Sequence, residues 1–130
     1  MSALDKLTQD ALRTEPDYSA AKDRLSDVHT VRLLHVAMGL VTEAGEFLDM
    51  LKKHVFYGRP IDKVNADEEL GDVSWYLRVG AHELEKSLLG IMERNAAKLR
   101  LRFPEKFTEA DANVRNLDAE RKFLEEDFLR

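Results

Sequence analysis

Apolar residues recur at helical spacing along this chain, and no segment alternates apolar and polar residues as a strand would. Prolines at positions 16, 60 and 104 divide the pattern. The segments predict helices over Ser2 to about Thr14, Ser26–Tyr57, Asn65–Leu84, Ser87–Phe103 and Asp118–Leu129, with an irregular segment from Glu105 to Asn116. We therefore predict an all-α, four-helix-type bundle with short N- and C-terminal helical additions. The whole chain, residues 1–130, is expected to form a single domain.

The helix predicted over residues 26–57 is apolar around most of its circumference, which is typical of a helix at the centre of its bundle. Its apolar stripe comprises Leu34, Met38, Val41, Gly45 and Leu48, and is widened by Leu33, Ala37, Leu40, Ala44, Phe47 and Leu51. The remaining sector comprises His35, Gly39, Thr42, Glu43, Glu46, Asp49 and Lys53. Glu43 is bordered by apolar residues, which is unusual for a solvated face.

The helix predicted over residues 65–84 repeats this arrangement. Its predicted core stripe comprises Ala66, Leu70, Val73, Leu77 and Leu84. Glu69, Asp72 and Tyr76 lie beside that stripe, with apolar residues on their other side as well. The two acids are therefore not expected to lie on an ordinary solvated face.

Two pairs of acids have the spacing that places both members on one helical face. They are Glu43 with Glu46, and Glu69 with Asp72. If the two helices pack antiparallel, four carboxylates meet, and their mutual repulsion requires a cation. Oxygen ligands without a thiolate or a convergent histidine favour Mg²⁺, with Mn²⁺ as a possible substitute.

The helix predicted over residues 87–103 carries residue types that bind phosphate. Asn95, Lys98 and Arg102 follow one another at helical spacing beside an apolar stripe. A cationic edge opposite a carboxylate–metal cluster suits a polyphosphate, because the metal and the cations share its negative charge. Lys52 and Lys53 are expected on a solvated edge, and His35 and Trp75 in the core.

Composition narrows the class of protein. The chain has 25 acidic and 20 basic residues, giving a net charge of -5, which argues against stable nucleic-acid binding. There is no cysteine, so disulfides and thiolate metal sites are excluded. The N-terminus lacks the pattern of a signal peptide, and the longest apolar stretch, Val36–Val41, is too short to cross a membrane. We expect a cytoplasmic protein that does not bind membranes.

Three blocks of the sequence resemble the MazG-like, all-α nucleoside triphosphate pyrophosphohydrolases. The first is the E-x-x-E motif of Glu43 and Glu46, and the second is the E-x-x-D motif of Glu69 and Asp72, after 22 intervening residues. The third is the segment Asn95-Ala-Ala-Lys-Leu-Arg-Leu-Arg-Phe-Pro104. The resemblance covers about Val31 to Phe107, and it is carried by the order and spacing of the blocks.

This resemblance implies an enzyme, with the four acids as metal ligands and catalytic residues. The implied reaction is the Mg²⁺-dependent hydrolysis of a nucleoside triphosphate to the monophosphate and pyrophosphate. It further implies nucleotide contacts from Asn95, Lys98 and Tyr76, and assembly into a homodimer or homotetramer. Many members of the family carry another glutamate where this chain has Thr42, which implies one metal fewer or weaker metal binding.

Two other functions are alternatives for an all-α chain with paired acids. A di-iron carboxylate bundle needs E-x-x-H motifs, and the residues three positions after Glu46 and Glu69 are both aspartates. A catalytically silent helical regulator is the remaining alternative, and it is disfavoured because all four acids are present. Apolar residues in the last segment favour a homo-oligomer, because one small bundle would not bury them all: Leu117, Phe123, Leu124 and Phe128.

Overall fold

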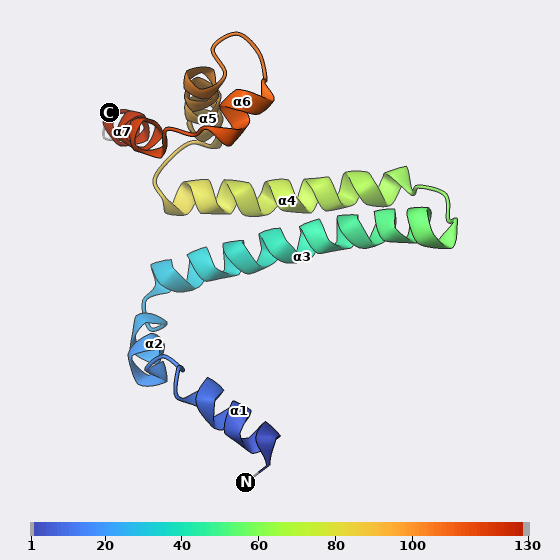
Figure 1. The fold of residues 1–130 in the computed structure, drawn as a ribbon. Helices are drawn as coiled ribbons and strands as arrows, with labels where there is room; N and C mark the ends of the chain where they lie inside the picture. The colour runs from blue at the N-terminus through green and yellow to red at the C-terminus, as the bar shows by residue number, and fades with distance from the viewer. Residues whose placement is uncertain (1, 129–130) are drawn as a thin grey trace.

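The computed structural model describes residues 2–128 and confirms the all-α prediction (Figure 1). Its helices are α1 (Ala3–Leu12), α2 (Tyr18–Arg24), α3 (Val28–Tyr57), α4 (Lys63–Glu83), α5 (Leu88–Arg102), α6 (Glu109–Asn113) and α7 (Leu117–Phe128). No strand occurs among these residues. The two longest helices, α3 and α4, lie side by side and antiparallel, which is the packing under which the sequence predicts that the four acids meet.

The ends of α3 and α4 follow from local chemistry. Gly58 ends α3 with a φ of 66°, a left-handed conformation that glycine adopts without a Cβ penalty. Asp62 begins α4, because its carboxylate accepts hydrogen bonds of 3.1 Å from the backbone N–H groups of Val64 and Asn65. The helix thus begins at Lys63, two residues before the predicted start at Asn65.

Two short helices lie in segments for which none was predicted. The Asp17 side chain caps α2, and the Thr108 side chain caps α6, which interrupts the segment predicted to be irregular. A capping residue alone is a weak signal for a helix when no apolar periodicity follows it in the sequence. Leu129, the predicted last residue of the terminal helix, lies outside the described residues.

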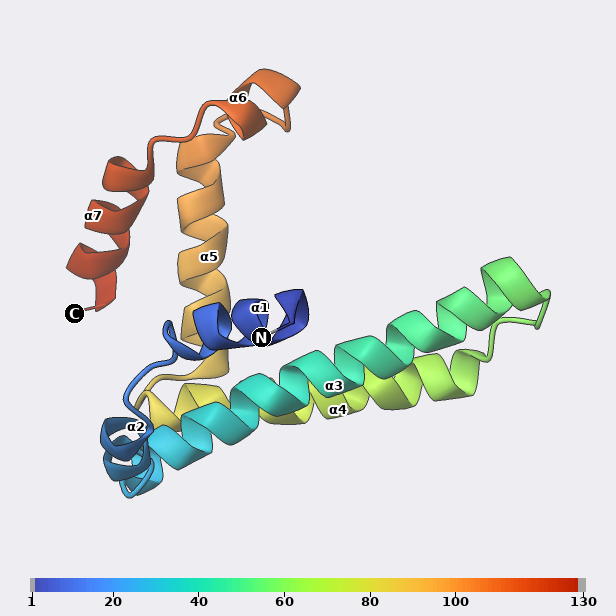
Figure 2. The same cartoon turned by 60° about the horizontal axis from the view of Figure 1, so that its bottom comes forward.

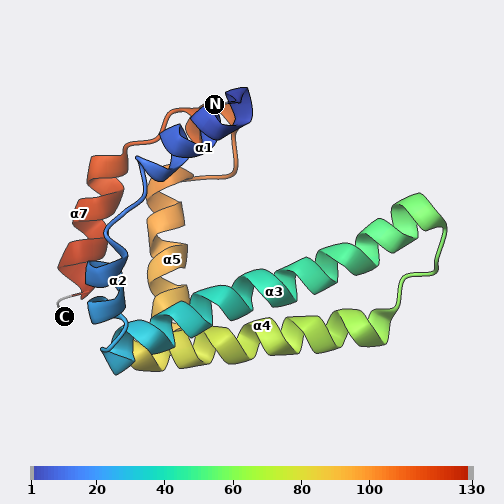
Figure 3. The ribbon, with the colours of Figure 1, turned by 90° about the horizontal axis from the view of Figure 1, so that it is seen from below.

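The four longest described helices pack as two pairs, α3 with α4 and α5 with α7. Helix α5 leaves the end of α4 at a steep angle, and α7 runs alongside it (Figures 2 and 3). Glu120 of α7 is buried and binds Arg102 of α5 through two hydrogen bonds of 2.6 and 2.8 Å, while Arg115 adds a third of 3.0 Å. This ion-pair network fixes the second pair.

The faces of α3 and α4 that meet are not the predicted stripes. Val36 and Met50 of α3 and Ala81 of α4 are buried, whereas Met38 is 60% and Val41 73% exposed. The remaining large apolar residues of the predicted stripes that are exposed are Leu33, Leu34, Leu48, Leu70, Leu77 and Leu84. The expectation that these stripes form the core is thus not met within one chain, because the buried residues of α3 are Val36, Gly39 and Met50, which lie outside its predicted apolar stripe.

Candidate functional site

Three of the four predicted acids converge in the middle of the helical hairpin. Glu43 of α3 and Glu69 and Asp72 of α4 each offer a carboxylate oxygen, and these oxygens lie within 4.8 Å of one another. The convergence arises because the antiparallel packing brings the two motifs to the same level. These three form the candidate metal group.

Glu69 is the most unusual member of this group, since only 4% of its surface is exposed. Its carboxylate accepts one hydrogen bond, of 2.7 Å, from the Asn65 side-chain amide one turn earlier. No cation pairs with it among the side chains that the structure describes. A buried carboxylate without a countercharge is costly, so this position calls for a cation from outside the chain.

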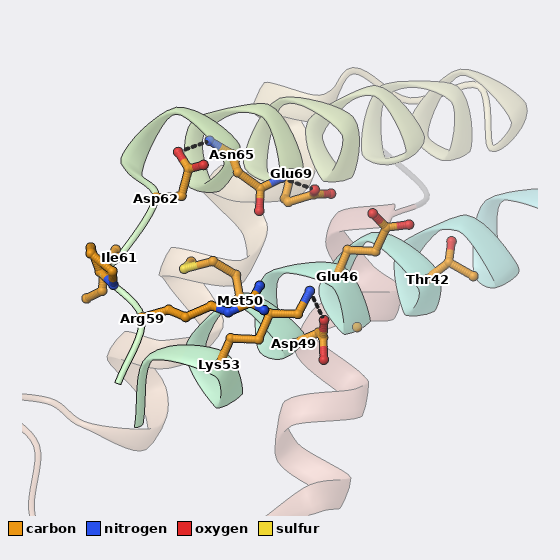
Figure 4. Close-up of a pocket in the computed structure, with 12 residues that line it drawn as sticks. Thr42, Glu46, Asp49, Met50, Lys53, Arg59, Ile61, Asp62, Asn65 and Glu69 are labelled. Atoms are coloured by element: carbon orange, nitrogen blue, oxygen red, sulfur yellow. Dashed lines mark hydrogen bonds and ion pairs between the residues drawn. The ribbon is translucent and has the colours of Figure 1, made fainter. Parts of the chain in front are cut away.

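Glu46, the fourth acid, is exposed and lies outside the group of three. It lines an open pocket of about 980 Å³ between the ends of α3 and α4, shared with Glu69. Figure 4 shows both side chains extending into the space between the two helices. The other polar residues lining this pocket include Thr42, Asp49, Lys53, Arg59, Asp62 and Asn65.

A second, smaller pocket of about 380 Å³ adjoins the same group on its other side and is lined by Glu43, Asp72, Trp75 and Tyr76. The rings of Trp75 and Tyr76 meet edge to face, 4.9 Å apart, and the His35 ring lies 5.5 Å from Tyr76. Tyr76 thus packs between the helices and lines a pocket. The core prediction for Trp75 and His35 is not met, because both are exposed.

The predicted phosphate-binding residues of α5 do not reach the acids of the same chain. None of Asn95, Lys98 and Arg102 lines either pocket beside the acids. Arg102 is engaged by Glu120: its hydrogen bonds, with those of Arg115, lower the pKa of Glu120 to about 2, and the same pairing raises the pKa of Arg102. Substrate contacts from these three residues stay predictions, and within one chain nothing brings them to the acids.

Two cations that sequence reasoning missed lie in the larger pocket instead. Lys53, expected on a solvated edge, is half-buried and forms an ion pair of 2.6 Å with Asp49. Asp49 also binds Lys52 at 2.5 Å, and hydrogen bonds from Lys52 and then Lys53 lower the pKa of Asp49 to about 2. The sequence contained a signal for Lys53, which lies two helical turns after Glu46 in the same sector.

Arg59 is the second missed cation, and the end of α3 positions it. Its backbone N–H donates to the Lys53 carbonyl oxygen at 3.3 Å, and its own carbonyl oxygen accepts from His54 Nδ1 at 2.7 Å. The side chain then extends toward Met50 and Lys53 (Figure 4). Its guanidinium has no ion-pair partner within residues 2–128.

Comparison with known proteins adds one relative. Over 77 residues the chain is 42% identical to the Gene 37 protein of Mycobacterium phage L5, a match that spans 54% of this chain and 65% of that protein. No protein-family model and no solved structure matches the chain. No described helix is both long enough and apolar enough to cross a lipid bilayer. The site is therefore interpreted from its own chemistry.

Proposed function

We propose that this protein hydrolyses a nucleoside triphosphate to the monophosphate and pyrophosphate, using Mg²⁺ held by Glu43, Glu69 and Asp72. The observation that carries the proposal is the buried carboxylate of Glu69, which has two acids beside it and no cation. A divalent ion offsets the repulsion among three carboxylates, and a bound polyphosphate supplies further oxygen ligands to the same ion.

The donor set fits a hard cation. Carboxylate oxygens bind Mg²⁺ at about 2.0–2.1 Å, so oxygens around one ion lie within about 4 Å of one another. The three oxygens here lie within 4.8 Å, so small side-chain rotations suffice to bring them to that separation. Zinc and iron sites usually include histidine or cysteine, and the group has neither.

The four acids divide between two roles. Glu43, Glu69 and Asp72 hold the metal, which supplies charge stabilisation for the phosphoryl oxygens when bound. Glu46 accepts the proton of the attacking water, because it faces the same pocket as Glu69 yet stands outside the metal group. Water attacks a substrate phosphorus in line with the departing pyrophosphate.

The resemblance to MazG-like pyrophosphohydrolases supports this reaction, since the two acidic motifs and the third block occur in the family's order. The similar phage protein is named only by its gene number, so it neither supports nor opposes an activity. The chain spans 65% of that protein, and any shared role is part of the proposal.

Assembly belongs to the same proposal. The stripes of α3 and α4 that face outward are apolar, and a patch of this kind marks a protein interface. A second copy packing its hairpin against these stripes would form a four-helix bundle and bury them. In such a homo-oligomer, α5 of one copy is free to bring Asn95 and Lys98 to the acids of another.

The test is pyrophosphate release from a panel of ribo- and deoxyribonucleoside triphosphates with Mg²⁺ or Mn²⁺. We expect release that stops in excess EDTA and returns on adding metal. Glu46→Gln, Glu69→Gln and Asp72→Asn should each lower turnover by at least about 100-fold, the scale of a lost catalytic acid–base group or metal ligand. Glu68→Gln is the matched control, since Glu68 is an exposed neighbour that lines neither pocket.

Three outcomes would contradict the proposal. Full activity in excess chelator would show that hydrolysis needs no metal. Near wild-type turnover in the three variants would show that these acids are not the catalytic site. If no nucleotide of the panel is hydrolysed while Mg²⁺ still binds, the silent regulatory protein becomes the better interpretation.

A further inference from the structure

The two pockets and the metal group lie in one line along the helical hairpin. Trp75 and Tyr76 line the pocket at one end, the three carboxylates lie in the middle, and Lys53 and Arg59 line the pocket at the other end. Successive turns of α4 carry Tyr76, Asp72, Glu69 and Asn65 in that order. The line is therefore polarised, with an aromatic end and a cationic end.

We propose that Lys53 and Arg59 form the subsite for the terminal phosphates, so that the triphosphate lies along the hairpin with its nucleoside toward Trp75. This inference rests on the proposed function and names the side chains that hold the leaving pyrophosphate. Lysine and arginine bind phosphate oxygens through charge-assisted hydrogen bonds. Within one chain, Lys53 and Arg59 line the pocket beside the acids, whereas Asn95, Lys98 and Arg102 do not.

The larger pocket is lined by four acids and two cations, and the cations Lys53 and Arg59 are the side chains there that can bind an anion. The Asp62 carboxylate is occupied as the cap of α4, and Asp49 already has two lysines. Lys53 is thus free to turn to a phosphate, because Asp49 keeps Lys52 as its partner. Arg59 can bind a phosphate without breaking an existing ion pair, since its guanidinium has no ion-pair partner among the described residues.

The position of the subsite relative to the metal group also fits. Lys53 follows Glu46 by seven residues, or about 10 Å along α3, and its side chain extends back over part of that distance. Arg59 is fixed beside Lys53 by the backbone hydrogen bonds at the end of α3. A chain of phosphates that starts at the carboxylates therefore ends at these two cations.

Inorganic pyrophosphate with Mg²⁺ is the probe, because it needs no knowledge of the base. Binding is measured by calorimetry, and by ³¹P line broadening where affinity is weak. Lys53→Met and Arg59→Met should each weaken pyrophosphate binding by about tenfold or more, the scale of one lost charge-assisted hydrogen bond. Lys63→Met is the matched control, since Lys63 is exposed at the start of α4 and does not line the pocket, and this variant should bind pyrophosphate like wild type.

Helical content and thermal stability of each variant establish that the fold is kept. Three results would overturn the subsite: no pyrophosphate binding by the wild-type protein at millimolar concentration, an equal loss in Lys63→Met, or a loss in Lys98→Met but not in Lys53→Met. The nucleotide panel is a separate measurement. Failure to hydrolyse any nucleotide alongside a selective loss in Lys53→Met and Arg59→Met would reject the proposed function and retain the subsite.

Discussion

Gly39 lies where the Tyr76 ring crosses the backbone of α3. A Cβ built at Gly39 would lie 2.1–2.5 Å from three atoms of that ring, far inside van der Waals contact. The glycine thus lets a large side chain of α4 approach the α3 backbone. That close approach, together with Gly80 against Val36, sets the level at which the acids of the two helices meet.

Gly39→Ala should therefore destabilise the protein. Overpacking against Tyr76 costs about 1–3 kcal/mol, which outweighs the gain of up to about 1 kcal/mol from the better helix propensity of alanine. Gly71→Ala is the control, because Gly71 is exposed and its added Cβ meets nothing within 4 Å, so this change should stabilise. Urea unfolding measures both, and equal stability gains would contradict the close approach.

Glu69 gives a second prediction at this scale, which concerns stability rather than turnover. Glu69→Gln removes a buried negative charge while keeping the shape of the side chain, so the metal-free protein should melt at the same or a higher temperature. Wild-type protein should gain about 1.4 kcal/mol from Mg²⁺ at ten times its dissociation constant, and the variant much less. A thermal shift of equal size in both proteins would speak against Glu69 as a ligand.

The open end of the hairpin is held by polar contacts between α3 and α4. The Glu83 carboxylate is buried against α3, where it accepts a hydrogen bond from Arg32 at 3.0 Å and pairs with His29. The hydrogen bond to Glu83 raises the pKa of His29, and the charges of Glu83 and Asp27 act in the same direction. Protonated His29 thus links the start of α3 to the end of α4.

This link should weaken as pH rises. Because the pKa of His29 is higher in the folded chain than in the unfolded chain, where it is about 6.5, its contribution is complete below about pH 6.5. The contribution is lost as pH rises through the folded-state pKa. Melting temperatures of wild type and His29→Gln should differ most at pH 6 and converge as pH rises through the folded-state pKa of His29. The difference should be modest, since His29 is exposed. A difference in melting temperature that stays constant with pH would exclude titration of His29 as its cause.

At the scale of the whole molecule, the surface is unusually apolar for a chain that works alone. Large apolar side chains are exposed along the outward faces of α3 and α4, and few residues are fully buried in the described part of the chain. A buried core of this size does not offset the entropy of ordering 130 residues. We expect the exposed apolar side chains of α3 and α4 to be buried against another copy of the chain.

We accordingly expect light scattering at micromolar concentration to give the wild-type protein the mass of a dimer or tetramer of the 14.9 kDa chain. The double change Met38→Glu and Val41→Glu places two charges on the outward stripe of α3 and should shift the species toward monomer. Val114→Glu is the control, since Val114 is 81% exposed between α6 and α7, away from that stripe. A monomeric wild-type protein would refute the assembly.

Sequence alone determined the helical class, most helix ends and the pairing of acids on one face. These properties are local: helical periodicity places Glu43 with Glu46, and Glu69 with Asp72, whatever the helices pack against. Ser87 and Asp118 marked helix starts within one residue for the same reason. Antiparallel packing led us to expect that all four acids converge, and in the structure Glu43, Glu69 and Asp72 do so while Glu46 stays outside the group.

Only the tertiary structure decided which face of each helix turns inward and which cations stand beside the acids. An apolar stripe has the same pattern whether it packs against its own chain or against a second copy, so Val41 could not be assigned to the inside or the outside. Lys53 and Arg59 reach the pocket because the turn at Gly58 folds the chain back, and Arg102 is drawn away by Glu120. These outcomes depend on long-range packing and competing partners, which no local periodicity encodes.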